Sequence, residues 1–438
     1  MKQQCFGYSD TGRVKKENED AILMAVESGL YVLCDGCGGH AAGKIASKMT
    51  CSMTYEAIKA HRDAMEAYAA NPAAATRRQV LEAIESGVNA ASARVWQAAR
   101  SDPDKQGMAT TVVVLTILGN QAVVAHAGDS RLYLVRDGQV HQLTEDHTMG
   151  RRYVKMGLLT PQQARREPSA DRLLRAVGFF ERVRLETLHF ELIGGDVLLL
   201  CSDGLTAHLS DEELAGHCAA EPAAHLPRKL VELANRRGGA DNTSVIAVRV
   251  ESDDRAAAED LHLRIRALHS VPMFRSLKYV ELLRVLGVSH TEAWPAGAHV
   301  VREGEPGDRI FLNLAGGVDV VKKGHVLAEL PPGSLFGEMG FLDETERSAD
   351  VIARENVRAL VVPRRGLLQL LRRDRTLAVR VLWGLCRVLN QRLYHTSQEL
   401  LDARTSLADM ADAEPIYDDA DQSPLGDEED EQEGNGNA

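Results

Sequence analysis

Apolar residues in the first 250 positions follow two patterns. Continuous apolar runs predict β-strands over 31–35, 110–118, 122–126, 131–136, 184–192, 196–201 and 244–250. Apolar residues at helical spacing predict helices over 43–60 and 76–100, the second with Val80, Ile84, Val88, Ala91 and Val95 on one face. Strands that alternate with long helices indicate a mixed α+β domain.

After Pro272 the pattern changes to short β runs separated by glycines. These runs predict strands over 299–303, 310–315, 318–322, 327–330, 350–353 and 358–363. Their spacing is typical of an antiparallel jelly roll or barrel. A helix is predicted from 376 to about 404, with apolar residues at Val379, Leu382, Leu385, Val388, Leu389 and Leu393.

Length and pattern together predict four segments. A chain of 438 residues exceeds what one hydrophobic core usually organises. We expect a first domain over 1–251, a charged, Ala-rich helical linker over 252–268 and a second domain over 269–404. The last segment, 405–438, is expected to be disordered, because the stretch from Asp409 has twelve acidic residues, no Lys or Arg and little to bury.

Charge and composition exclude several classes of protein. The formal charge of −12 comes from the acidic tail, since the rest of the chain has 51 acidic and 51 basic residues. The basic residues are scattered, so no nucleic-acid partner is expected. No run approaches the roughly 20 apolar residues of a membrane-spanning helix, and the N-terminus lacks the apolar core of a secretory signal. We expect a cytoplasmic protein with no membrane partner.

Two local motifs are set aside. The seven cysteines lack framework spacing and fit a reducing compartment. Cys34 and Cys37 form a C-x-x-C, but no second pair stands at zinc-ligand spacing, so a zinc or redox site is disfavoured. Residues 38–44 read G-x-x-x-x-G-K, similar to a phosphate-binding loop, but the following Ile45 has no hydroxyl for Mg²⁺.

Acidic residues recur where the predicted strands begin or end. They occur in Asn18-Glu19-Asp20, Asp35-Gly36, Gly128-Asp129, Ser202-Asp203 and Asp241-Asn242. Each Asp-Gly alone is most simply a β-turn. As a set, carboxylates from several strand ends suit a hard cation such as Mg²⁺ or Mn²⁺, which prefers oxygen ligands.

This ordered set resembles the metal-dependent serine/threonine protein phosphatases of type 2C (the PPM family) in their bacterial form. The resemblance runs from about Asp10 to Val250, through SDTGRVKKENEDA, VLCDGCGGHAAG, GMATTVVV, AHAGDSRLY, LTEDHT, LLRAVG, LLLCSDGL and ADNTSVIAV. It implies an α-β-β-α sandwich with a two-metal centre at one end. It further implies in-line attack on phosphorus by water activated between Mn²⁺ or Mg²⁺ ions, without a covalent enzyme intermediate.

The resemblance also implies roles for individual residues. Asp35 would bridge the metals and Gly36 would supply a backbone carbonyl. Asp203 and Asp241 would complete the second site. The remaining metal residues would be Glu19 and Asp20, acting largely through water, and Asp129, at the position of a third, weaker metal.

Two positions depart from the family pattern. The family places an Arg five residues before the Asp of Asn-Glu-Asp, and this chain has Lys15 there, a point charge in place of a bidentate fork. Arg13 stands nearby and is most simply a surface residue. Some members carry a His where this chain has Cys37, and His40 is an alternative candidate for the general acid. The general acid therefore stays unassigned.

The second domain contains its own set of motifs: V-x-R-E-G-E-x-G-D over 300–308, Phe-Gly-Glu-Met-Gly over 336–340 and Glu-Arg-Ser-Ala-Asp over 346–350. A carboxylate such as Glu338 can accept hydrogen bonds from ribose hydroxyls, and Arg347 can pair with a phosphate. Alone, each would be read as a surface residue.

Together these motifs resemble cyclic-nucleotide-binding domains over roughly 271–400. The resemblance implies that Glu338, beside Gly337, takes the ribose 2′-hydroxyl and that Arg347 takes the cyclic phosphate, with the backbone of Ser348 and Ala349 alongside. The helix over 376–404 resembles the lid that closes over the base. No helix-turn-helix follows, so a transcription factor is disfavoured.

We therefore expect metal-dependent hydrolysis of phosphoserine and phosphothreonine on proteins, regulated by cAMP or cGMP bound to the second domain. The expected partners are phosphorylated proteins, among them serine/threonine kinases or their substrates. The alternative is a non-catalytic scaffold that binds phosphoproteins and senses cyclic nucleotide.

Overall fold

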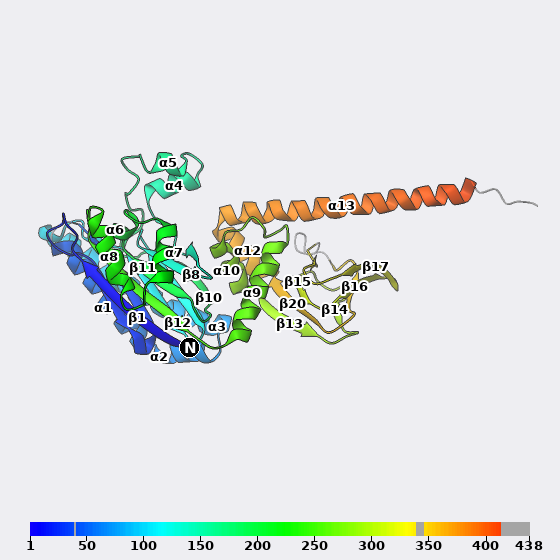
Figure 1. Ribbon diagram of the computed structural model, residues 1–438, viewed down its shortest axis with the longest axis horizontal. Helices are drawn as coiled ribbons and strands as arrows, with labels where there is room; N and C mark the ends of the chain where they lie inside the picture. The colour runs from blue at the N-terminus through cyan, green and yellow to red at the C-terminus, as the bar shows by residue number, and fades with distance from the viewer. Residues whose placement is uncertain (39–40, 339–345, 413–438) are drawn as a thin grey trace, which may run out of the picture. The chain divides into compact units, whose positions relative to one another are not determined.

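The computed structural model describes residues 1–38, 41–338 and 346–412. Residues Met1–Gly384 form one compact unit and residues Leu385–Ala438 form a second. The first unit contains two stacked sheets with their helices, followed by a β-roll (Figure 1).

The stacked sheets are antiparallel and five-stranded (Figure 1), with the orders β1-β12-β11-β8-β9 and β10-β7-β6-β3-β2. The first sheet contains β1 (Lys2–Asp10), β8 (Arg131–Arg136), β9 (Gln139–Gln142), β11 (Val197–Cys201) and β12 (Thr243–Glu251). The second contains β2 (Ala21–Ala25), β3 (Leu30–Cys34), β6 (Val112–Leu118), β7 (Gln121–Ala127) and β10 (Glu186–Glu191). The central strands are apolar throughout because they are covered on both faces.

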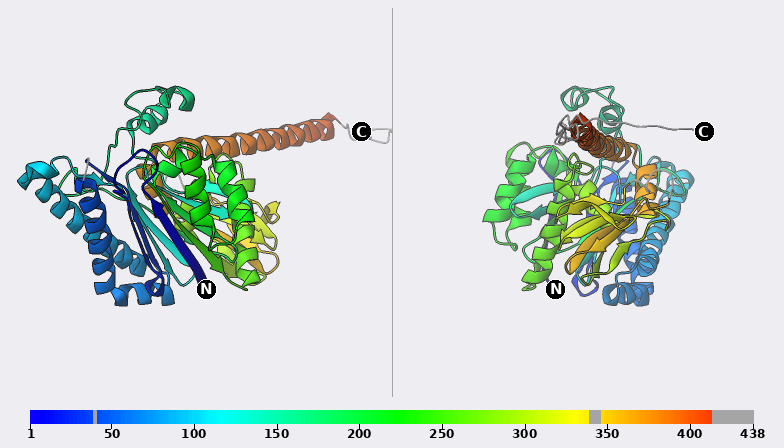
Figure 2. Two further views of the ribbon diagram at one scale, coloured as in Figure 1. Left: turned by 60° about the vertical axis from the view of Figure 1, so that its left-hand side comes forward. Right: turned by 90° about the vertical axis from the view of Figure 1, so that its right-hand side faces the viewer.

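Helices cover the outer face of each sheet, so the layers run helix, sheet, sheet, helix (Figure 2). The second sheet is covered by α1 (Ala41–Ala60) and α3 (Ala74–Ser101), and the first by α7 (Asp211–Ala220) and α8 (Leu226–Arg236). A third apolar cluster fills the space between the sheets. The shorter elements are η1 (Val26–Ser28), β4 (Gly36–Cys37), α2 (Arg62–Ala70), η2 (Pro103–Lys105), β5 (Ala109–Thr110), α4 (Met149–Lys155), α5 (Pro161–Ala164) and α6 (Asp203–Thr206).

The β-roll consists of two four-stranded antiparallel sheets with the orders β13-β20-β15-β18 and β14-β19-β16-β17. Its strands are β13 (His290–Trp294), β14 (His299–Val301), β15 (Arg309–Ala315), β16 (Val318–Lys322), β17 (His325–Leu330), β18 (Leu335–Phe336), β19 (Asp350–Ala353) and β20 (Val357–Pro363). The flanking helices are α9 (Arg255–Ser270), α10 (Tyr279–Val288), α12 (Arg364–Arg373) and α13 (Arg375–Asp412).

Helix α10 belongs to the core of the stacked sheets, although it follows the linker in the chain. Leu283 is fully part of the apolar cluster between the sheets, and Tyr279 packs against the same cluster. The Tyr279 hydroxyl accepts a 3.0 Å hydrogen bond from Arg136, which also makes a buried bidentate ion pair with Asp196 at 2.5 and 2.7 Å. Helix α10 is therefore part of the core of the sandwich, whereas the β-roll has a separate apolar cluster of its own.

The predicted fold class is confirmed: an α+β sandwich followed by a β-roll with helices. Several elements were not predicted from the sequence pattern: β1, β2, β4, β9, β13, β18, α2, α4, α5, α6, α7, α8, α10 and α12. Helix α13 also extends beyond the predicted helix. Of the acidic tail predicted over 405–438, residues 405–412 form the last turns of α13. The remaining residues, 413–438, lie outside the described part of the chain. None of the described helices is both long and apolar enough to cross a membrane.

The packing of α10 in the sandwich core makes a testable prediction for stability. Leu283→Ala is expected to destabilise the sandwich by about 2–5 kcal/mol, because Leu283 is only 1% exposed and its loss leaves a cavity between the sheets. Urea unfolding followed by circular dichroism measures this change. Leu158→Ala, at a side chain that is 60% exposed, is the control and should cost less than about 0.5 kcal/mol. Equal, small effects would show that α10 does not stabilise the sandwich.

Candidate metal centre

The five predicted aspartates converge at one end of the stacked sheets. They lie immediately before β2 (Asp20), after β3 (Asp35), after β7 (Asp129), after β11 (Asp203) and before β12 (Asp241). Burial raises the pKa of Asp35 well above its usual range, and the negative charges of the other four aspartates raise it further. The structure therefore brings together carboxylates that are far apart in the sequence.

Mutual repulsion extends to the other carboxylates of this cluster. Burial, followed by the nearby charges of Asp203 and Asp241, raises the pKa of Asp20 to about 7. Burial and the charge of Asp203 likewise raise the pKa of Asp129 to about 7. Such a set is costly when fully ionised, and bound divalent cations would relieve that cost.

Asp20, directly before β2 of the second sheet, is held by two serines of the first sheet, one directly after β11 and one in β12. Its Oδ2 accepts hydrogen bonds from the hydroxyls of Ser202 at 2.9 Å and Ser244 at 2.6 Å. Its other oxygen, Oδ1, is buried, and no described group donates a hydrogen bond to it. A buried carboxylate oxygen without a donor fits a site that receives a cation or its water. Sequence reasoning missed the role of both serines.

Asp35 is fixed through its backbone by threonines that precede β6. The Asp35 amide donates to Thr111 Oγ1 at 3.0 Å, and Thr110 Oγ1 donates to the Asp35 carbonyl at 2.8 Å. Thr111 also shares a 2.7 Å hydrogen bond with Ser130, which follows Asp129. These contacts set the distance between the Asp35 and Asp129 segments.

Gly36 is required by close approach of three backbone segments. A Cβ at this position would lie 2.3 Å from the carbonyl oxygen of Gly43 and 2.6 Å from that of Glu19. Only glycine allows the Glu19 loop and the start of α1 to pack here. Its carbonyl is the ligand that the resemblance assigns to it.

Asn242 fastens the N-terminal loop beside Asp241. Its Oδ1 accepts from the Glu19 amide at 2.9 Å, and its Nδ2 donates to the carbonyls of Thr11 and Glu17 at 2.9 and 3.0 Å. This positioning role was not assigned from sequence. The sequence feature that could have indicated this role is the position of Asn242 directly after Asp241, a member of the acidic set.

Lys15 lies at the rim of the cluster, where its Nζ is 2.8 Å from Asp241 Oδ1. That hydrogen bond, and the charges of Asp241 and of Glu19 beyond it, raise the pKa of Lys15. Arg13 is exposed and is held through its backbone amide, which donates to the Gly239 carbonyl. The structure thus places a cation beside the carboxylates at Lys15.

The cysteines nearby do not form a metal site among the described residues. Burial raises the pKa of Cys37 to about 11, so its thiol stays neutral. The pKa of Cys34 is raised by burial and by a hydrogen bond with Cys51, not with Cys37. His40 lies outside the described residues.

A second candidate site lies in the β-roll around Arg347, which is 7% exposed. Its guanidinium donates to the carbonyls of Gly337 and Arg309, each at 2.8 Å, and lies over the Phe311 ring. Burial lowers the pKa of Arg347, and no ion pair with a described residue neutralises its charge. A buried guanidinium that the described residues hold through backbone carbonyls fits an anionic ligand.

The other predicted nucleotide residues surround this guanidinium. Glu338 is 1% exposed, and its charge acts on Arg347. A Cβ on Gly337 would lie 2.8 Å from Arg347 Nη1, and its φ of +79° also favours glycine. Ala349 is buried and Ser348 is exposed, while residues 339–345 lie outside the described residues.

The raised pKa of Asp129 predicts a pH-dependent effect of charge removal. After divalent cations are removed with EDTA, Asp129→Asn should stabilise the protein. The folded pKa of about 7 exceeds the unfolded value of roughly 4, so the folded state binds more protons and loses stability as pH rises through this window. The stabilisation should be at least about 1 kcal/mol larger at pH 8 than at pH 5.

Thermal unfolding at both pH values measures this difference. Asp253→Asn, at an exposed position beyond β12, is the matched control and should change stability little at either pH. An Asp129→Asn effect that does not depend on pH would contradict the proposed repulsion.

Two known protein families match this chain, one over the stacked sheets and one over the β-roll. A family model described as "Protein phosphatase 2C" matches residues 11–237, and one described as "Cyclic nucleotide-binding domain" matches residues 291–374. Serine/threonine protein phosphatase PstP of Mycobacterium tuberculosis is 36% identical over 246 residues, which are 56% of this chain and 45% of PstP. Protein phosphatase PhpP of Streptococcus pneumoniae is 33% identical over 251 residues, 56% of this chain and 97% of PhpP.

Solved structures agree with these relatives. The crystal structure of M. tuberculosis PstP/Ppp has a TM-score of 0.50 at 32% identity, covering 57% of this chain and 100% of that one. The S. agalactiae serine/threonine phosphatase has a TM-score of 0.51 at 30% identity, with coverage of 57% and 100%. The phosphatase model matches just over half of the 438 residues, and the chain therefore belongs to the protein phosphatase 2C family.

Proposed function

We propose that the protein hydrolyses phosphoserine and phosphothreonine on proteins with the help of Mn²⁺ or Mg²⁺. The observation that carries this proposal is the convergence of five aspartates at one end of the sandwich, where burial and one another's charges raise the pKa values of Asp20, Asp35, Asp129 and Asp203. Family membership over 11–237 supports the reaction type. The phosphatase names of PstP and PhpP point to the same substrate class.

The chain offers a ligand set for two cations, with a third at Asp129. The ions would be held by Asp35, the Gly36 carbonyl, Asp203, Asp241, Glu19 and Asp20. Asp35 shares a hydrogen bond with Asp203, and Gly36 packs closely against the Glu19 backbone. When bound, the ions would supply an activated water and neutralise charge on the phosphoryl oxygens. The protein's own contribution is to fix the carboxylates through Thr110, Thr111, Ser202, Ser244 and Asn242 before substrate arrives.

Lys15 is proposed to bind the substrate phosphate. It stands beside Asp241 at the exposed rim, with its side chain 45% exposed, where a phosphorylated side chain can reach it. A lysine supplies one point charge, so phosphate binding is weaker than with the bidentate guanidinium that the family usually has there.

The β-roll is proposed to bind cAMP or cGMP and to regulate the phosphatase. Arg347 would take the cyclic phosphate and Glu338 the ribose hydroxyl, with Gly337, Ser348 and Ala349 lining the site. The match to the cyclic nucleotide-binding family and the buried guanidinium support this assignment. Phosphorylated serine/threonine kinases or their substrates, and a cytoplasmic location, remain predictions.

Turnover of p-nitrophenyl phosphate with Mn²⁺ tests the proposed reaction. Activity should require the cation, and Asp203→Asn should lower kcat by at least about 100-fold, because the ligand set loses a charge while the fold is kept. Asp211→Asn, eight residues further along at the exposed start of α7, is the matched control and should retain activity. Activity that persists in excess EDTA would contradict the metal-dependent reaction.

Calorimetric titration with cAMP and cGMP tests the proposed nucleotide site. Arg347→Ala should weaken binding by at least about tenfold, because the cyclic phosphate would be buried without its charge partner. Arg354→Ala removes an exposed arginine whose partner is Glu329, and serves as the matched control. Equal affinities in the two variants would show that Arg347 does not contact the phosphate.

A further inference from the structure

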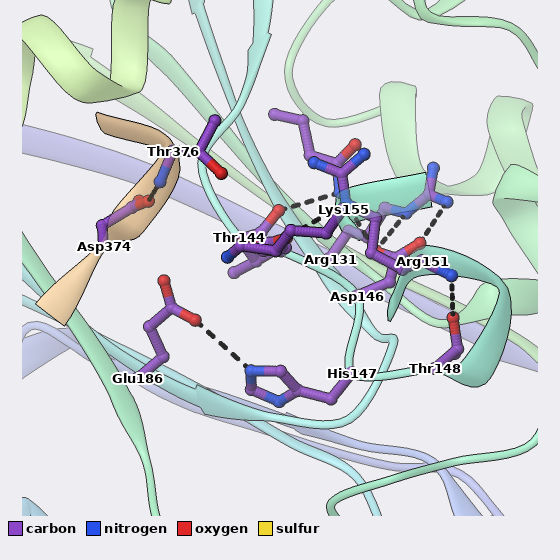
Figure 3. A network of polar contacts seen from close by, with 12 residues as sticks. Arg131, Thr144, Asp146, His147, Thr148, Arg151, Lys155, Glu186, Asp374 and Thr376 are labelled. Atoms are coloured by element: carbon purple, nitrogen blue, oxygen red, sulfur yellow. Dashed lines mark hydrogen bonds and ion pairs between the residues drawn. The ribbon is translucent and has the colours of Figure 1, made fainter. Parts of the chain in front are cut away.

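Glu186, the first residue of β10, lies between the candidate metal centre and helix α10. Its Oε2 is 3.3 Å from His147 Nε2, the contact drawn in Figure 3, and its Oε1 accepts a 2.6 Å hydrogen bond from Arg284 of α10. Glu186 and Arg284 are partly shielded from water, at 27% and 16% side-chain exposure. Neither residue has a role in the reaction proposed above.

On one side, this contact reaches the Asp129 segment. The Gly128 amide donates to His147 Nδ1 at 3.2 Å, and the His147 amide donates to the Gly128 carbonyl at 2.9 Å. Because an amide can only donate, Nδ1 accepts from Gly128, while Nε2 faces both Glu186 at 3.3 Å and the Arg175 guanidinium at 3.0 Å. His147 is thus held between Glu186 and the residue immediately before Asp129.

Close packing leaves the backbone at Gly128 little room to move independently of its neighbours. A Cβ there would lie 2.6 Å from the Thr111 side chain, and its φ is +115°. Thr111 in turn accepts the hydrogen bond from the Asp35 amide. A shift of His147 would therefore move the segments that carry two of the clustered carboxylates.

On the other side, the contact reaches the start of α13. Arg284 Nη1 donates to Asp374 Oδ2 at 3.0 Å. The second oxygen of Asp374 accepts from the amides of Thr376 and Leu377 at 3.0 and 3.1 Å, which caps the helix; Figure 3 shows the Thr376 bond. One guanidinium thus joins the cap of α13 to the carboxylate that orients His147.

The cluster of His126, His147 and Glu186 has the donor types of a metal site, but its surroundings do not suit a cation. Arg284 binds Glu186, and Arg175 Nη1 lies 3.0 Å from His147 Nε2. Two guanidinium charges would repel a divalent ion. The cluster is better explained as a polar connection between segments.

We propose that Arg284 and Glu186 are positioning residues that couple the nucleotide site to the metal centre, through Asp374 on one side and His147 on the other. The proposal rests on the proposed functions of both sites. Arg347 donates to the Arg309 carbonyl of β15, Arg309 pairs with Pro363 at the end of β20, and α12 leads from there to Asp374. Nucleotide binding at Arg347 would therefore alter the Asp374–Arg284 pair and, through Glu186 and His147, the Asp129 segment. Coupling of this kind is reciprocal: nucleotide changes metal affinity by the same factor as metal changes nucleotide affinity.

A second ion pair on the same strand provides the matched control. Arg264 of α9 makes a bidentate pair with Glu191, the last residue of β10, at 2.7 and 2.9 Å, and is 12% exposed. It also joins a helix after the sandwich to β10. Within the described part of the chain, its ion pairs with Glu191 and Asp260 reach neither Gly128 nor the cap of α13.

Calorimetric titration of the full chain with cAMP, with and without saturating Mn²⁺, measures the coupling directly. In the wild type, Mn²⁺ should change the cAMP dissociation constant by about fivefold or more. Arg284→Met should reduce the ratio to within about twofold of one, whereas Arg264→Met should keep it. Glu186→Gln, which keeps the side-chain shape but removes the charge, should act as Arg284→Met does, and thermal unfolding verifies that each variant is folded.

The outcomes separate the coupling from the proposed functions. Separate titrations with cAMP and with Mn²⁺ establish that each binds the wild type, and failure of either overturns the corresponding proposed function and the coupling with it. If both bind but the ratio in the wild type is one, the coupling alone is wrong. A ratio that persists in folded Arg284→Met and Glu186→Gln also overturns it.

Discussion

Electrostatic repulsion among carboxylates at one end of the sandwich is the constraint on which the rest of the structure depends. Asp20, Asp35 and Asp129 all carry raised pKa values because each is buried near the others. Holding such groups together requires a rigid frame, and the frame is supplied by antiparallel strands covered by helices on both outer faces. Divalent cations bound here would neutralise the carboxylate charges, and the relief of this repulsion would increase the affinity of the site for the cations.

The fold could be predicted where local pattern and burial agree. Central strands such as β6 and β7 are largely apolar because both of their faces are covered. Such a continuous apolar run is visible in the sequence alone. Helix α10 was missed because its packing is a property of the tertiary structure: Leu283 fills a gap between sheets whose strands lie more than thirty residues away in the chain. The first strand, β1, was missed because its first residues alternate between exposed and half-buried without a strong apolar signal.

The candidate site, too, could be predicted from the sequence only in part. Acidic residues next to strand ends were visible in the sequence, and the structure brings Asp20, Asp35, Asp129, Asp203 and Asp241 together. The residues that hold them were not visible, because a serine or asparagine carries no sign of its partner. Ser202 and Ser244 meet Asp20 across 182 and 224 positions of sequence. Only the fold shows that Asn242 ties the Glu19 loop to the opposite sheet.

The placement of α10 has a consequence for how this chain can be divided. The family match ends at 237, yet Leu188 and Phe190 of β10 lie in the same apolar cluster as Leu283. His189 on that strand is 2.8 Å from the Gly287 carbonyl. A fragment ending after β12 would leave this apolar surface facing water, where it would favour aggregation. The smallest piece with a complete interior therefore extends past the linker, and the unit that folds is longer than the segment that matches the family.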